Sequence, residues 1–324
     1  MIVRMSHKWK PARVALGPAK LLARSRHLRH ATSRARILPS YLIIGAQRAG
    51  TTSLFDNLCR HPDVAAPTAS KDEVFWAKEL HFFDDRFWRG VDWYRAFFPL
   101  ASSRSVARLR GADLITGEAS PSYLFHPGVP ARVAATLPGV RLIALLRDPV
   151  ERAFSHYQLM HRKGIEKLSF EDALAAEEER LAGEEERIVA DPRYASQNYR
   201  DYSYVLRGLY ADQLERWFEH FPREQILVLR AEDFFARPAE IYADVLVFLG
   251  LRPWKVHDFV RRNRAAYQPI DPALRARLTA RFAEPNARLA RLLNRDFAWG
   301  SAASVAGPMA RNAEIASARG PQRA

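Results

Sequence analysis

The chain has 324 residues, of which 48% are hydrophobic and 11% aromatic, a composition typical of globular proteins and not of fibrous or disordered ones. It has one cysteine, Cys59, which excludes an intrachain disulfide and a cysteine-rich zinc site. A reducing, cytoplasmic compartment fits this cysteine usage best. No apolar run reaches the roughly 18 residues that a membrane-spanning helix needs.

The net charge of +14 is unevenly distributed. Residues 1–40 hold ten lysines and arginines and no acid, so the remainder of the chain carries only +4. The charge therefore describes a basic leader and gives no reason to expect a specific nucleic-acid partner. We predict that residues 1–40 form a disordered arm. The alternatives are an amphipathic segment that contacts an anionic membrane peripherally and a start codon assigned too far upstream.

Apolar runs alternate with helical patterns along the chain. A run at residues 41–44 ends at Gly45 and precedes helical spacing at 51–60, and a second run at 140–146 ends before Asp148 and Pro149, a good N-cap and first helical residue. A third run, at 226–229, lies between amphipathic stretches at 204–221 and 238–249. This alternation predicts an α/β fold, a single P-loop-like domain whose central parallel sheet has helices on both faces.

We place this domain at residues 41–299 and expect residues 300–324 to form a flexible tail. Residues 169–188 hold eight acids, and we interpret them as the solvated face of a helix and not as a cation site. Residues 272–293 are expected to form two short helices around Pro285. The oligomeric state is left open.

The turn after the first run has the spacing of a phosphate-binding loop. It places two glycines five residues apart, Gly45 and Gly50, between a strand and a helix, so that backbone N–H groups can hold anionic oxygens. A nucleoside-triphosphate loop would have lysine at position 51, which here is Thr51, and the nearest cation is Arg48. The alternative is a tight turn that binds no ligand.

A second anion signal follows residues 140–146. A kinase or ATPase would end such a strand in aspartate to organise magnesium, whereas this one ends in Arg147. Ser155 lies within the first two turns of the next helix, so both side chains could bind a phosphate at the carboxyl edge of the sheet. The alternative is that Arg147 only pairs with Asp148 or Glu151 at the surface.

These two motifs resemble the 5′-phosphosulfate loop and the 3′-phosphate motif of sulfotransferases that use 3′-phosphoadenosine 5′-phosphosulfate (PAPS), particularly the heparan sulfate sulfotransferase branch and its bacterial relatives. The segment 78–84, Lys-Glu-Leu-His-Phe-Phe-Asp, is similar to the one in which that branch places its catalytic glutamate. Segments 92–95, 117–123 and 207–210 resemble further motifs, in the same order. The likeness covers about residues 41–299. Arg48 stands where this branch usually has lysine, and Ala119 where the heparan enzymes have a lysine that faces substrate.

The resemblance implies a PAPS-dependent sulfotransferase whose product is adenosine 3′,5′-bisphosphate (PAP) and which needs no metal. It implies catalytic roles for Glu79 as general base, Arg48 in charge stabilisation and His81 as orienting group or competing base, since positions 79 and 81 of a strand face the same side. The implied donor-binding residues are Gly45, Gln47, Arg48, Ala49, Gly50, Thr51, Thr52, Ser53, Arg147, Ser155, Tyr210 and Arg264.

The acceptor implied by the resemblance is a hydroxyl or amine of a glycan, glycoconjugate or small molecule, and the sequence does not choose between O- and N-sulfation. Two other function classes are weighed against this one. A P-loop kinase or NTPase would need a lysine near Thr51 and an aspartate in place of Arg147. A non-catalytic polyanion-binding module would explain the leader but gives no role to Glu79.

Overall fold

The computed structural model describes residues 25–69, 78–262 and 268–300. Its centre is a five-stranded sheet of order β2-β3-β1-β4-β5, in which every pairing is parallel. The strands are β1 (Tyr41–Gly45), β2 (Val64–Ala65), β3 (Ile115–Glu118), β4 (Arg141–Leu146) and β5 (Ile226–Arg230). The predicted α/β fold with a central parallel sheet is confirmed.

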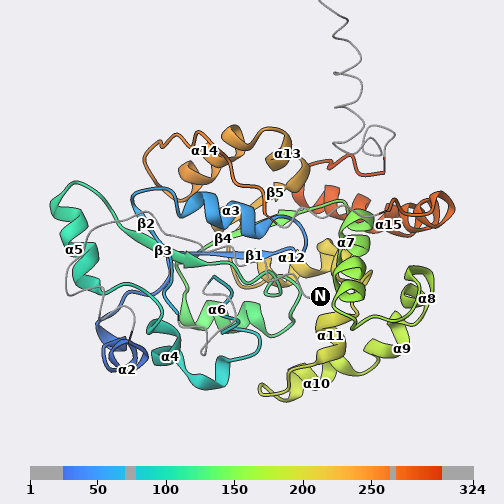
Figure 1. Ribbon diagram of the computed structural model, residues 1–324, viewed down its shortest axis with the longest axis horizontal. Helices are drawn as coiled ribbons and strands as arrows, with labels where there is room; N and C mark the ends of the chain where they lie inside the picture. The colour runs from blue at the N-terminus through green and yellow to red at the C-terminus, as the bar shows by residue number, and fades with distance from the viewer. Residues whose placement is uncertain (1–24, 70–77, 263–267, 301–324) are drawn as a thin grey trace, which may run out of the picture.

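Helices cover both faces of the sheet (Figure 1), as parallel sheets require. They are α2 (Arg26–Ala31), α3 (Thr51–Leu58), α4 (Val91–Arg95), α5 (Ala101–Leu109), α6 (Val129–Thr136), α7 (Pro149–Arg162), α8 (Phe170–Ala175), α9 (Glu177–Leu181), α10 (Glu184–Ala190), α11 (Gln197–Asp201), α12 (Tyr210–Phe218), α13 (Ala231–Ala236), α14 (Pro238–Phe248) and α15 (Pro272–Leu293). Four short 3-10 turns, η1 (Ser33–Ala35), η2 (Phe87–Arg89), η3 (Leu206–Gly208) and η4 (Arg223–Gln225), complete the described elements. In Figure 1, α3, α13 and α14 lie on one side of the sheet and α6 on the other.

The central strands are apolar because both of their faces are covered. Every residue of β1 is buried, and β4 is buried from Leu142 to Leu146. These two strands pair in register from Tyr41 opposite Arg141 to Ile43 opposite Ile143, so their carboxyl ends lie side by side. The loops after β1 and β4, which carry Arg48 and Arg147, therefore begin next to each other. This is the point at which the strand order changes direction and at which open α/β sheets bind ligands.

The predicted start of α7 is confirmed. The Asp148 carboxylate accepts hydrogen bonds from the backbone N–H groups of Val150 at 2.9 Å and Glu151 at 3.2 Å, and Pro149 is the first helical residue. This cap fixes the direction in which the chain leaves β4, and therefore the position of Ser155, which lies within the first two turns of α7.

The boundary expected at residue 41 is too late. Residues 25–40 hold α2 and η1, Arg29 is fully buried and lies over the Phe97 ring, and Arg36 donates to the Phe98 carbonyl oxygen at 2.7 Å. In the sequence, Arg29 and Arg36 count among the charges of the basic leader. In the structure both side chains are buried, and their aliphatic stems pack against the body of the protein. The folded part of the chain therefore begins no later than Ser25. The rest of the expected arm, residues 1–24, and the tail beyond residue 300 lie outside the described residues.

Two further expectations were wrong. Pro285 lies inside one continuous helix, α15, because Leu278, Phe282 and Leu289 on both sides of it bury into the core along one face. The acidic stretch 169–188 forms three short helices, and two of its acids are buried. Glu177 accepts hydrogen bonds from the backbone of Val205 and Leu206, so it joins segments and is not a solvated side chain.

Two truncations test the revised boundary. A chain that starts at Ser25 keeps every contact described above, and we expect its urea unfolding midpoint to match that of the full chain. A chain that starts at Ile37 loses Arg29 and Arg36 with their buried contacts, and it should be less stable by about 1–3 kcal/mol. Equal midpoints for the two truncations would show that residues 25–36 are dispensable for folding.

Candidate functional site

The loop from β1 to α3 is shaped to bring backbone close to a ligand. Gly50 has a φ of 103° and caps α3, and a Cβ built on it would lie 2.6 Å from the Phe235 ring. No larger residue fits this position, because both the backbone angle and the space require glycine. The first N–H groups of α3, those of Thr51 and Thr52, have no acceptor within the helix and point to the end where an anion is favoured.

Arg48 lies at the centre of this loop, with a φ of 73°. Its Nε donates to Ser155 Oγ at 3.0 Å, a contact between residues more than a hundred positions apart. Its backbone carbonyl accepts a hydrogen bond from Arg147 Nη1 at 3.2 Å. Arg147 is itself held by Tyr210, whose hydroxyl donates to the Arg147 carbonyl oxygen at 2.8 Å. The structure thus brings together Arg48, Arg147, Ser155 and Tyr210.

Arg147 also makes the surface contact that the sequence left open. Its Nη2 lies 3.4 Å from a Glu151 carboxylate oxygen, and both side chains are about a quarter exposed. Such a pair in partial contact with solvent contributes little stability, so it does not prevent Arg147 from binding an anion.

The remaining loop residues lie around this group. Ala49 is buried, Gln47 is half-buried, and the Gln47 Oε1 atom is buried without a hydrogen-bond partner in the described part of the chain. Ser53 Oγ accepts a hydrogen bond from the backbone N–H of Arg262 at 2.9 Å. The Arg262 guanidinium is paired with Asp56 at 2.6 Å, so its side chain is already committed. Arg264 lies outside the described residues.

The second half of the site is the segment 78–85. It joins the end of β3 through a hydrogen bond from the Ala119 N–H to the Lys78 carbonyl oxygen at 2.8 Å, and it is not a regular strand. Glu79 Oε2 lies 3.8 Å from His81 Nε2, and the Lys78 ammonium contacts the other Glu79 oxygen. The two side chains face each other as expected, although the cause is the left-handed backbone of His81, whose φ is 49°, and not strand geometry.

Asp84 completes this group, and the sequence analysis gave it no role. His81 Nδ1 lies 2.9 Å from Asp84 Oδ2, and Ser122 Oγ donates to the same carboxylate at 2.5 Å. Arg132 Nη1 donates to the carbonyl oxygens of Phe83 at 2.7 Å and Asp84 at 3.2 Å. The signal that could have found Asp84 is its spacing of three residues from His81 within the quoted motif.

The charges in this group determine the protonation states. Burial opposes ionisation of Glu79, but the hydrogen bond from His81 and the charge of Lys78 outweigh it and lower the Glu79 pKa to about 2. Burial also disfavours a charged His81, but the Asp84 carboxylate outweighs it and raises the His81 pKa well above its ordinary value. These shifts favour a carboxylate at Glu79, an imidazolium at His81 and a carboxylate at Asp84.

A buried carboxylate, Glu118, supports the segment from below. It is fully buried at the end of β3 and accepts hydrogen bonds from Leu80 N at 3.1 Å, Ser120 Oγ at 2.7 Å, Tyr94 Oη at 2.7 Å and Tyr123 Oη at 2.9 Å.

Two of the donors to Glu118, Ser120 and Tyr123, also accept hydrogen bonds from the backbone of the segment 78–85. His81 N donates to Ser120 Oγ at 3.1 Å, and Phe82 N donates to Tyr123 Oη at 2.9 Å. This network explains the quoted stretch 117–123: it fixes the backbone that carries Glu79 and His81.

One group of side chains in the described residues could offer ligands to a metal. Single ligand atoms of His81, Asp84 and Asp85 lie within 4.8 Å of one another. Burial and the charge of Asp84 raise the Asp85 pKa to about 6, and the His81 imidazolium carries a proton where a metal ligand needs a lone pair. That no metal is needed stays a prediction.

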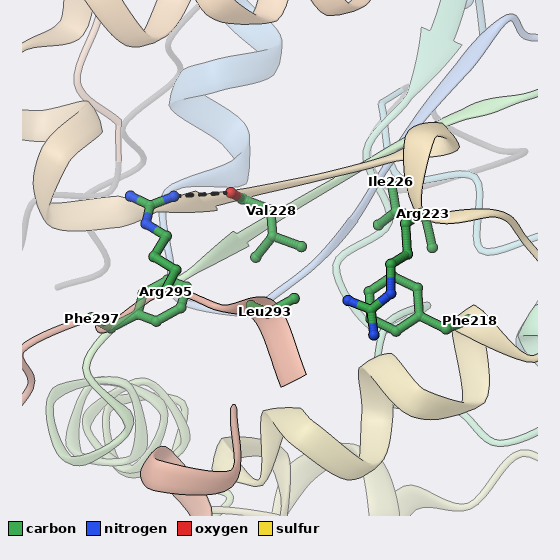
Figure 2. A pocket seen from close by; sticks show the side chains of 7 residues that line it. All are labelled: Phe218, Arg223, Ile226, Val228, Leu293, Arg295 and Phe297. Carbon is green, nitrogen blue, oxygen red and sulfur yellow. Dashed lines mark hydrogen bonds between the residues drawn. The ribbon is translucent and has the colours of Figure 1, made fainter. Parts of the chain in front are cut away.

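A cavity of about 260 Å³ lies apart from all of these residues. Figure 2 shows it between β5, the end of α12 and the chain after α15. Its two guanidiniums are committed, because Arg223 donates to the Leu292 carbonyl oxygen at 2.7 Å and Arg295 to that of Val228 at 3.3 Å. Of the predicted site residues that the structure describes, none lines this cavity.

Comparisons with known proteins agree with the motifs. A family model described as the sulfotransferase domain matches residues 38–263. The chain is similar to heparan sulfate glucosamine 3-O-sulfotransferase 3B1 of Mus musculus, with 34% identity over 215 residues, 66% of this chain and 47% of that protein. It is similar to bifunctional heparan sulfate N-deacetylase/N-sulfotransferase 3 of Homo sapiens, with 29% identity over 283 residues, 80% of this chain and 30% of that protein. The chain spans less than half the length of these two curated relatives.

A solved structure extends the likeness to three dimensions. The crystal structure of a sulfotransferase from Alicyclobacillus acidocaldarius has 34% sequence identity and a TM-score of 0.58, and the match covers 82% of this chain and 100% of that one.

The protonation state of His81 can be measured directly. Because Asp84 raises its pKa, we expect His81 to titrate well above the ordinary value of about 6.5 in ¹⁵N-edited NMR spectra, whereas Asp84→Asn should move its titration down toward that value. The stabilisation from this pair is present below the unfolded-state pKa and is lost as the pH rises through the raised folded-state pKa.

His126 provides an internal control in the same spectra. Burial, opposed by the Asp84 charge and supported by Arg132 and Arg207, lowers its pKa to about 4, so it should be neutral at pH 7. A His81 that titrates near 6.5 in the unchanged protein would contradict the arrangement described here.

Proposed function

The chain belongs to the sulfotransferase family, and we propose that it transfers a sulfuryl group from PAPS to a hydroxyl or amine of a carbohydrate or glycoconjugate acceptor. The observation that carries the proposal is the grouping of Arg48, Arg147 and Ser155 at the N-terminus of α3. The Glu79 segment lies at the same edge of the sheet, since it is joined to the end of β3, the neighbour of β1.

The donor side is suited to a ligand with phosphates at two positions. The loop offers Arg48 and the first N–H groups of α3 to the 5′-phosphosulfate, with Gly45, Gln47, Ala49, Gly50, Thr51, Thr52 and Ser53 as its frame. Arg147 and Ser155, with Tyr210 behind Arg147, would bind the 3′-phosphate. Arginine suits this task because its planar fork binds phosphate oxygens in pairs.

On the acceptor side, Glu79 is the proposed base. In the transfer, the bond from sulfur to the leaving phosphate oxygen breaks, a bond to the acceptor oxygen or nitrogen forms, and the acceptor proton passes to the Glu79 carboxylate. The Asp84 carboxylate favours the protonated form of His81, which makes His81 the weaker candidate for that proton. Its role is to orient Glu79, while Asp84 keeps the imidazole charged.

The low pKa of Glu79 makes it a weak base while Lys78 and His81 hold it. An acceptor that carries an anionic group could draw the Lys78 ammonium away from Glu79. Removal of one neighbouring cation raises the pKa of a carboxylate toward the working range. The site therefore favours an anionic acceptor, and the rate depends on the binding that frees Glu79.

No observation favours the kinase or the non-catalytic binding module. A kinase site needs an aspartate where β4 ends in Arg147 and a lysine near Thr51.

No helix in the described ranges is long and apolar enough to span a membrane. Peripheral membrane contact through the basic leader, the cytoplasmic compartment and the absence of a specific nucleic-acid partner stay predictions.

Binding of the donor product can be tested without chemistry. We expect PAP to bind in the presence of a metal chelator, with a clear preference over adenosine 5′-monophosphate, because Arg147 and Ser155 recognise the 3′-phosphate. Arg48→Ala should weaken PAP binding about tenfold or more, measured by calorimetry. Binding that requires magnesium and prefers ATP would refute the proposal.

A second pair of variants separates the base from its orienting partner. Glu79→Gln keeps size and packing but cannot accept a proton, so turnover should fall by about 10² or more while PAP affinity stays within a few fold. Glu178→Gln, an exposed glutamate on α9, is the matched control and should leave both unchanged. Near-normal turnover of Glu79→Gln, together with loss of turnover in His81→Ala, would move the base to His81.

A further inference from the structure

A groove of about 730 Å³ lies at the amino ends of the strands, on the edge opposite the proposed transfer site. It is formed by residues 36–40 before β1, by the start of β3, by residues 136–141 before β4 and by Leu249 after α14. Strands β1 and β4 have five and six residues, so about 16 Å or more separates this groove from the loops at their carboxyl ends. The groove is therefore a separate site.

The side chains that line the groove are strongly cationic. They include four arginines, Arg36, Arg95, Arg104 and Arg141, and one acid, Asp113. Asp113 is already shared between two arginines, since Arg104 Nε lies 3.1 Å and Arg108 Nε 3.3 Å from the same oxygen. The acid therefore does not neutralise the groove.

Two of the guanidiniums have unused hydrogen-bonding capacity. The Arg95 Nε atom is buried and has no hydrogen-bond partner in the described part of the chain. Arg141 is exposed at the start of β4, and no hydrogen bond or ion pair is found for its side chain among the same residues. By contrast, Arg36 is committed to the Phe98 carbonyl oxygen and to Thr32. A buried N–H donor without a partner loses free energy unless a ligand or water satisfies it.

We propose that this groove binds an anionic segment of a polysaccharide, the same polymer that the transfer site sulfates, through carboxylate or sulfate groups on Arg95 and Arg141; this rests on the proposed function. Guanidinium forks match such groups. Among the described residues, no aromatic side chain lines the groove, so they offer no stacking surface of the kind on which neutral sugars bind, and charge must carry the recognition. A concave groove fits a chain better than a flat membrane.

The bound polymer would raise the effective concentration of acceptor sugars at the transfer site. A polymer held at the amino edge presents its neighbouring sugars to the carboxyl edge as an intramolecular partner, so long acceptors bind more tightly than short ones.

The probe is a fluorescently labelled heparan sulfate octasaccharide, with fluorescence anisotropy as the readout. The double variant Arg95→Gln with Arg141→Glu should raise its Kd about tenfold, and Arg141→Glu alone, at an exposed position, about threefold. Lys167→Glu is the matched control, an exposed cation that precedes α8, at the far end of the molecule from α5 in Figure 1. It should leave the Kd unchanged, and PAP affinity should not change in any of these variants.

Transfer assays separate this proposal from the proposed function. With a polymeric acceptor, KM should rise in the groove variants while kcat and the KM of a disaccharide acceptor stay constant. Unchanged octasaccharide binding in the groove variants would overturn the proposal that the groove binds the polymer, whether or not sulfuryl transfer occurs. A groove-dependent loss that is larger for RNA or for anionic vesicles than for the octasaccharide also overturns it. If the groove variants weaken octasaccharide binding but no sulfuryl group is transferred from PAPS, polymer binding in the groove is supported and the proposed function is refuted.

Discussion

The Glu118 carboxylate is the group on which the position of the segment 78–85 depends. It is fully buried, and four groups from three parts of the chain donate to it: the backbone N–H of Leu80 and the hydroxyls of Tyr94, Ser120 and Tyr123. Burial raises its pKa, while these donors favour the ionised form and limit the rise. Burying a carboxylate costs free energy unless its oxygens accept hydrogen bonds. A network that lacks one of these donors would therefore destabilise the folded protein.

The order of the strands places this network beside the loops that follow β1 and β4. Because β3, β1 and β4 are neighbours, the Glu118 network, the phosphate-binding loop and Arg147 all begin at one edge. The two sides of that edge differ in charge: arginines gather after β1 and β4, and carboxylates with an imidazolium gather after β3. Both sides have left-handed backbone at a residue proposed for the site, with φ of 73° at Arg48 and 49° at His81. Such strain persists where the surrounding contacts fix the chain, here the bonds to Ser155 and Ser120.

The sequence predicted three of the five strands and the turn after β1 well, because those features are local. The apolar runs that become β1, β4 and β5, the Asp148 cap and the glycine spacing of the loop each show within a few residues. What lay beyond the sequence depends on tertiary contacts. Glu118 and Asp84 gain their roles only when β3 meets the segment 78–85, and Arg29 and Arg36 resemble leader charge until their stems are seen to pack on the body. Pro285 was read as a break, but burial of one continuous helix face overrides it.

The most direct test of the account is a transfer assay from labelled PAPS to a panel of carbohydrate acceptors, with the products identified by mass spectrometry. We expect that an acceptor gains one sulfuryl group for each PAP formed, that transfer proceeds in the presence of a metal chelator, and that anionic sugars are the better acceptors. Transfer of a phosphoryl group from ATP, or nucleotide binding with no sulfated product from any acceptor, would contradict it.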